Sequence, residues 1–230
     1  MSDTMKKLIT RTFVAILTLC VLWYTGNPVS WIEARIKIAQ HLENNYGPGY
    51  TFDCHYMWFG HTKGYTGTAS KKYSKDDNFH VYYFNDGTTK DNRRTYVTSG
   101  LKTSYRISDE YKALVKPILE QMAGLHIHDA HFYKMPEEMF VVDKEYDITS
   151  LAAEYGTLVL SFEEKDGSMS EYADKLLEIK QLCDDNKITF AYIDLDAVKN
   201  NRYVGGVSFD GIPYSFIYAE NLVDRLYLNK

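Results

Sequence analysis

The chain has 230 residues, with 26 Lys and Arg against 31 Asp and Glu, and its formal net charge is −5 at pH 7. Hydrophobic residues make up 45% and charged residues 25%, which is ordinary for a folded protein and excludes an intrinsically disordered chain. Duplex binding requires a concentrated basic face, so no nucleic-acid partner is expected.

An apolar stretch near the N-terminus, residues 8–24, reads LITRTFVAILTLCVLWY. A helix needs about 17–25 residues to cross the hydrocarbon core of a bilayer, and this stretch reaches that length if Arg11 extends to the interface. Lys6 and Lys7 precede it, so the positive-inside rule predicts a cytoplasmic N-terminus. The pattern therefore predicts a transmembrane anchor within residues 1–26, with the lipid bilayer as a partner through residues 8–24.

Two alternatives to this anchor remain open. A cleaved signal peptide also combines a basic start with an apolar core, but residues 23–28 lack the pair of small residues that its cleavage site requires. A buried helix of a soluble protein is the other alternative, but the clustering of basic residues at one end argues against it. The preferred prediction places the protein in the cell membrane as a single-pass protein, with the C-terminal domains extracellular.

The segment 27–105 is predicted to form a helix followed by an antiparallel sheet. Asn27 and Pro28 end the apolar helix, and Ser30 with Glu33 has the form of a capping box that opens a second helix ending near Tyr46. Its apolar face is predicted to hold Ile32, Ile36, Ala39, Leu42 and Tyr46. Short connections favour an antiparallel meander of four strands, predicted at residues 50–59, 65–73, 79–84 and 94–98.

This order of elements resembles a known family. A short apolar helix with basic flanks, then Gly26-Asn27-Pro28, an amphipathic helix ending near Tyr46 and a tyrosine-rich meander is similar to the YfjL-like proteins. These are small membrane-anchored proteins of Gram-positive bacteria, and the resemblance covers residues 5–100. It implies an uncharacterised extracytoplasmic protein and supplies no catalytic residues.

The segment 106–230 is predicted to be a second small α+β domain. Ser108 is expected to open a helix with a full apolar stripe, Asp147 begins a short helix, and Ser168 with Glu171 forms another capping box. A parallel pair of strands is plausible around the helix at 170–185. A hairpin over residues 202–218 and a last helix at 219–228 complete the order. The predicted fold class is α+β: a transmembrane helix, a helix-plus-meander domain and a second α+β domain.

Histidines gather in one strand predicted in the second domain, where the chain reads His126-Ile127-His128-Asp129-Ala130-His131. Side chains two residues apart in a strand share a face, so His126 and His128 could offer two ligands to a metal ion such as zinc. Asp129 and His131 would point to the opposite face unless a bulge or turn intervened. A polar strand face is the alternative.

No nucleophile motif, phosphate-binding loop or dinucleotide fingerprint is present in the sequence, so no catalytic residues and no cofactor are predicted. Cys54 and Cys183 are expected to be buried free thiols. The predicted function is a non-enzymatic binding or interaction module, with an envelope polymer or a membrane protein as a possible partner. The alternative is a metal-binding protein or metal-dependent enzyme centred on His126 and His128.

Overall fold

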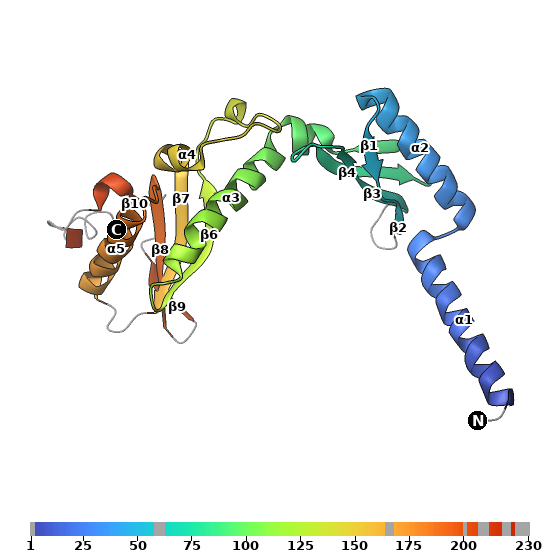
Figure 1. The fold of residues 1–230 in the computed structure, drawn as a ribbon, viewed down its shortest axis with the longest axis horizontal. Helices are drawn as coiled ribbons and strands as arrows, with labels where there is room; N and C mark the ends of the chain where they lie inside the picture. Colours follow the sequence, from blue (N-terminus) through green and yellow to red (C-terminus); the bar gives the residue numbers. More distant parts are fainter. Residues whose placement is uncertain are drawn as a thin grey trace. The chain divides into compact units, whose positions relative to one another are not determined.

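The computed structural model describes residues 3–57, 63–163, 168–199, 202–206, 212–217 and 222–223. The chain divides into two compact units, Met1–Lys102 and Thr103–Lys230. Each unit contains a five-stranded sheet with helices, which is an α+β architecture (Figure 1).

The first unit is built from two long helices and an antiparallel sheet. Its elements are α1 (Asp3–Thr25), α2 (Pro28–Tyr46), β1 (Tyr50–Phe52), β2 (His55–Met57), β3 (Gly64–Lys71), β4 (Asn78–Phe84), β5 (Thr89–Asp91) and the π-helical turn η1 (Arg94–Thr98). The strand order is β1-β3-β4-β5, with β2 also paired to β3, and every pairing is antiparallel, as predicted. The strand predicted at 94–98 is wrong, because those residues form η1.

The helix α1 corrects the prediction of a membrane anchor. Within the described residues, no helix has both the length and the apolar character that crossing a membrane requires. Lys6, Lys7 and Arg11 belong to α1 itself, and the charge-free part from Thr12 to Thr25 spans only about 21 Å at about 1.5 Å per residue, short of the hydrocarbon thickness of about 30 Å. The predicted transmembrane helix at 8–24, its single-pass topology and the membrane localisation are therefore wrong.

The helix α2 lies along one face of the first sheet (Figure 1). Its buried side chains are Ala34, Ile38 and Leu42, whereas Ile32 and Ile36 are 54% and 51% exposed. The sheet residues buried on this face alternate along their strands, as one-sided packing requires: Tyr65, Gly67, Ala69, Phe79, Val81 and Tyr83. The predicted apolar stripe through Ile32 and Ile36 is thus on the wrong side of the helix.

The second unit combines antiparallel and parallel pairing in one sheet. Its elements are α3 (Leu101–Leu119, which begins at the end of the first unit), β6 (Leu125–Phe132), η2 (Glu137–Met139), α4 (Ile148–Tyr155), β7 (Gly156–Glu163), α5 (Met169–Asp185), β8 (Tyr192–Lys199), β9 (Arg202–Gly206), β10 (Ile212–Pro213) and η3 (Tyr214–Phe216). The strand order is β10-β8-β7-β6, and β9 also pairs with β8. β7 and β8 are parallel and α5 connects them, as predicted.

Three details of this unit differ from the sequence prediction. α3 begins at Leu101, seven residues before the predicted start at Ser108. β9 and β10 each pair with β8 rather than with each other, so the predicted hairpin is wrong. The turn expected at residues 210–211 and most of the helix expected at 219–228 lie outside the described residues.

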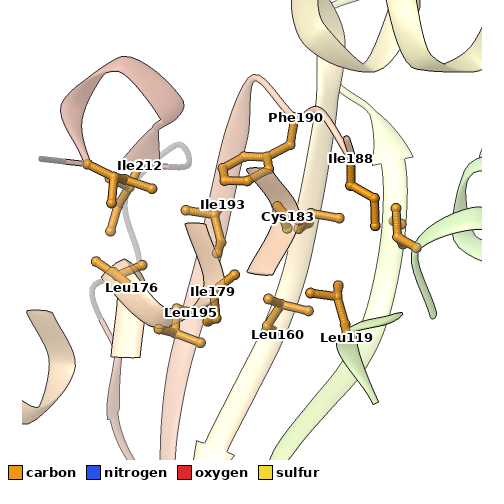
Figure 2. Close-up of a cluster of buried hydrophobic side chains, with 14 of the residues drawn as sticks. Leu119, Leu160, Leu176, Ile179, Cys183, Ile188, Phe190, Ile193, Leu195 and Ile212 are labelled. Atoms are coloured by element: carbon orange, nitrogen blue, oxygen red, sulfur yellow. The ribbon is translucent and has the colours of Figure 1, made fainter. Parts of the chain in front are cut away.

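The core of the second unit lies on one face of its sheet. Figure 2 shows Leu160 of β7 and Ile193 and Leu195 of β8 near Leu176 and Ile179 of α5. α3 contributes a further buried stripe to the same core: Ile107, Tyr111, Val115 and Leu119. The sheet is therefore covered by two helices on this face, and it is the opposite face of β6 that carries the predicted histidine cluster.

Candidate functional site

A cavity of about 910 Å³ lies in the first unit, at the corner between α1 and α2. Ligand sites typically have volumes of about 300–1,000 Å³, so this cavity has room for a small molecule. Its walls come from the two helices, β2, β3, and β4 with the turn after it: Leu22, Gly26, Asn27, Pro28, Ser30, Glu33, Tyr56, Tyr65, Tyr83, Asn85, Asp86 and Gly87.

The corner is fixed by the tripeptide between the helices. Gly26 has φ +64 and its N–H donates to the Leu22 carbonyl at 2.8 Å, which closes the end of α1. Asn27 is the N-cap of α2, and its side-chain oxygen accepts the N–H of Val29 at 3.0 Å. Pro28 occupies the first helical position, where its missing N–H costs nothing. The Gly-Asn-Pro sequence therefore sets both helix ends that border the cavity.

Glu33 contributes a carboxylate to this cavity. The predicted capping box would have turned Glu33 back towards the start of the helix, but α2 begins at Pro28 with Asn27 as its cap. Glu33 instead accepts a hydrogen bond from the Tyr83 hydroxyl at 2.8 Å. This bond, with burial and the negative field of Glu33 and Asp86, raises the pKa of Tyr83.

Asp86 supplies a second carboxylate from the turn after β4. Its Oδ1 accepts the N–H of Thr88 at 2.9 Å and the Thr88 hydroxyl at 2.7 Å. These two bonds lower the pKa of Asp86, so the group is ionised at neutral pH. Burial raises the pKa of Tyr65, whose hydroxyl donates to the Asn27 carbonyl at 3.2 Å. The cavity lining therefore combines the ionised carboxylate of Asp86 with the protonated hydroxyls of Tyr65 and Tyr83.

A second polar cluster in the first unit connects α2 to the ends of the sheet. Asp77 is 3% exposed and accepts two bonds from the Arg93 guanidinium, at 3.0 and 2.8 Å, and one from the Tyr50 hydroxyl at 2.5 Å. Asp91 accepts from His41 Nε2 at 2.6 Å and from the Tyr46 hydroxyl at 2.8 Å. Burial is the main cause that raises the pKa of Tyr46 and of Tyr50 to about 12.

The buried acceptors of this cluster are already satisfied by protein donors. Arg93 also stacks over the ring of Tyr46, with 4.8 Å from its Cζ to the ring centroid. A charge pair with two parallel hydrogen bonds is strong and geometrically restrictive. We therefore interpret the cluster as a structural connection between α2, β1 and β5 rather than as a site for a ligand.

The strand β6 places the predicted metal ligands next to a bulge. The pairing of β6 with β7 shifts between Ile127 and Asp129, so His128 is the extra residue. Beyond the bulge Asp129 lies opposite Val159 and His131 opposite Thr157, while His126 before it lies opposite Ser161. Opposed residues of an antiparallel pair point to the same side. The bulge thus brings Asp129 and His131 to the face of His126, which a regular strand would not do.

These side chains nevertheless bind to neighbours within the protein. His128 Nε2 lies 2.8 Å from Ser161 Oγ, and Asp129 lies 3.2 Å from His131 and 3.6 Å from Lys112. In the part of the chain that the structure describes, no three or more His, Cys, Asp or Glu side chains are arranged to hold a metal ion. The metal site at His126 and His128 stays a prediction, and the geometry adds no further ligand to it.

Both cysteines outside α1 are buried free thiols. Burial raises the pKa of Cys54 to about 11 and that of Cys183 to about 12. Nucleophilic cysteines require a lowered pKa, so these thiols are protonated and unreactive at neutral pH. They contribute to packing.

The cavity was not predicted from the sequence. Its carboxylates and tyrosines run from Glu33 to Asp86, 53 residues apart, and only the fold brings them together. The one local signal was Gly26-Asn27-Pro28, which was used as a family feature and as a helix break. Asn followed by Pro is typical of a helix N-cap and its first helical residue, and this pattern marks the corner.

Comparison with known proteins identifies a family for the C-terminal half of the chain. The family model described as YfjL-like C-terminal domain matches residues 110–227, just over half of the chain. No curated protein matches the sequence.

Among solved structures, a DUF5037 family protein from Ruminococcus gnavus ATCC 29149 matches over 71% of this chain and 73% of its own. The sequence identity is 14% and the TM-score 0.25, too low for any argument about function or fold. The family match itself lies beyond residues 5–100, on which the resemblance was based, so the two are separate observations. The chain belongs to the YfjL-like family.

Proposed function

We propose that the protein is a non-enzymatic binding module and that its ligand site is the cavity between α1 and α2. The observation that supports this most directly is the cavity itself, which has a volume of about 910 Å³ and combines three tyrosines with two carboxylates. Ligand sites commonly pair aromatic walls with a few polar groups that fix orientation.

The chemistry of the cavity favours binding over catalysis. Glu33 already accepts a hydrogen bond from Tyr83. The raised pKa of Tyr83 keeps its hydroxyl protonated at neutral pH, so Tyr83 is a poor general base. The carboxylate of Asp86 is held by Thr88 and its pKa is lowered, so it is a poor general acid. A catalytic acid or base needs a pKa near the working pH, and these shifts lead away from it.

A fragment screen by saturation-transfer NMR on the full-length chain tests the proposal. Asn85 is exposed at the rim of the cavity, so Asn85→Trp should block the entrance without disturbing the core. Asn44→Trp, at an exposed position of α2 that does not line the cavity, is the matched control. We expect fragments to bind the wild type and the control and to bind Asn85→Trp at least tenfold more weakly. Fragments that bind all three proteins alike, or none that bind the wild type, would overturn the proposal.

A further inference from the structure

We propose that the cavity recognises an organic cation, a ligand with a protonated or quaternary amine. This inference rests on the proposed function, because it names the ligand class of the same site. The lining residues that the structure describes include two carboxylates from different elements, Glu33 and Asp86, and no Lys, Arg or His. Lys90, which helps to lower the pKa of Asp86, lines a neighbouring pocket instead. The net charge of the lining is therefore negative.

The half-buried ring of Tyr56 fits the same class of ligand, whereas the rings of Tyr65 and Tyr83 behind the lining are only 2% and 7% exposed. Tyr56 and Tyr65 lie edge to face, with 5.2 Å between ring centroids, and Tyr83 lies directly opposite Tyr65 in the pairing of β3 with β4. The face of an aromatic ring carries negative potential that attracts a cation, most strongly where water is partly excluded. Carboxylates beside tyrosine rings are the combination used to recognise quaternary and protonated amines.

The helix ends at the corner do not reverse this electrostatic preference. The N-terminus of α2 carries a partial positive charge of about +0.5, which alone would favour an anion. The C-terminus of α1 meets it at the same corner, and its partial charge is about −0.5. The two helix ends therefore largely cancel each other.

Pro28 has no N–H, and two backbone donors at the start of α2 are engaged. The N–H of Val29 is bonded to the Asn27 side chain, and that of Trp31 to the Asn27 carbonyl at 2.9 Å. An anion-binding helix terminus needs several such donors free to face the ligand. The charge of Glu33 and Asp86 thus decides the preference, and it selects a cation.

Choline and its isostere 3,3-dimethylbutan-1-ol have nearly the same shape, but only choline carries a positive charge. Comparing their affinities therefore separates recognition of the charge from recognition of the shape. We expect choline to bind the full-length protein at least tenfold more tightly than the alcohol, in calorimetric titrations at constant ionic strength. Glu33→Gln combined with Asp86→Asn should weaken choline binding at least tenfold and leave the affinity for the alcohol unchanged. Glu43→Gln, which removes an exposed carboxylate of the same helix outside the cavity, is the control and should bind choline as the wild type does.

The outcomes distinguish the ligand class from the site. Equal binding of choline and the alcohol, with both abolished by Asn85→Trp, would overturn the cation inference and leave the cavity as a binding site. Choline binding that persists in Asn85→Trp, or that is lost in Glu43→Gln, would overturn the inference because recognition would then occur elsewhere. If neither compound binds, the cation inference fails, and the fragment screen alone decides whether the cavity binds ligands.

Discussion

Gly26 is held in a conformation that other residues rarely adopt. Its φ of +64 lies in the left-handed region, and a Cβ placed there would come within 2.9 Å of the Tyr56 ring. The left-handed region costs an L-residue about 1–2 kcal/mol. The ring contact adds to this cost, because Tyr56 packs against Tyr65 and would have to move.

We therefore predict that Gly26→Ala destabilises the protein by more than the strain of about 1–2 kcal/mol alone. Gly124→Ala is the control, since Gly124 also has a positive φ of +74 but a Cβ there would meet only the Glu163 Cβ at 3.8 Å, an ordinary contact. Urea unfolding of the two variants should show the larger loss for Gly26→Ala. Equal losses of unfolding free energy would mean that the Tyr56 ring moves aside without an energetic cost.

Asp91 makes the stability of the first unit depend on acid pH. Burial alone would raise the pKa of Asp91, but bonds from His41, the Arg93 N–H and Tyr46 outweigh it and lower the pKa. A carboxylate with a lowered folded-state pKa stabilises the fold above its unfolded pKa of about 3.9. That contribution is lost as the pH falls through the folded value.

We expect the difference in unfolding free energy between the wild type and Asp91→Asn to shrink below about pH 4. Urea unfolding at a series of pH values measures this difference. A difference that stays the same down to pH 3 would show that the hydrogen bonds of Asp91 do not depend on its charge.

At the scale of elements, local capping patterns predict the starts of α4 and α5 correctly but not those of α2 and α3. The N-caps Asp147 and Ser168 are both where the pattern placed them, and their side chains accept the backbone N–H of Ser150 and Glu171. The same kind of signal at Ser30 and Ser108 lies inside α2 and α3, because those helices begin earlier, at Pro28 and Leu101. The parallel pairing of β7 and β8 is also readable from the sequence, because the helix α5 between them provides the crossover connection that parallel strands need.

Ser168 is accordingly predicted to stabilise α5. Ser168→Ala should lower the free energy of unfolding by about 1 kcal/mol, because the bond from Glu171 N–H, 3.0 Å long, is lost. Ser170→Ala, two residues further on and inside the helix, should change it by much less. Thermal or urea unfolding checks both, and similar effects at the two positions would argue against the cap.

Elements whose position depends on a partner surface were predicted less well. α2 has apolar residues on two sides, and periodicity cannot tell which side the sheet will cover, so Ile32 and Ile36 were preferred over Ala34 and Ile38. α3 was started at the strong cap signal of Ser108, although the helix begins after Gly100, whose φ is +79. The candidate cavity shares this difficulty, since its walls come from elements that only the fold assembles.

At the scale of the whole molecule, the second unit has a core of its own. Every buried residue of its main hydrophobic cluster belongs to residues 107–222. The match to the family model, residues 110–227, covers nearly the same part of the chain. A core that needs no side chain from elsewhere should fold independently.

The fragment 101–230, which keeps α3 whole, is therefore predicted to unfold cooperatively in urea. Far-ultraviolet circular dichroism and intrinsic fluorescence should report a single coincident transition for this fragment. A fragment without a cooperative transition would show that the second unit depends on residues 1–100.

The bulge in β6 has a consequence for how the length of this chain can vary. Because His128 is the one residue without a partner in the pairing of β6 with β7, removing it would leave Ile127 opposite Leu160 and Asp129 opposite Val159. Ordinarily, losing one residue from a paired strand turns every following side chain to the other face. Here the deletion would restore a regular ladder and keep Ala130 and Phe132 in the core. Relatives one residue shorter at this point are thus compatible with the same sheet, and an alignment gap is expected there before any other position of β6.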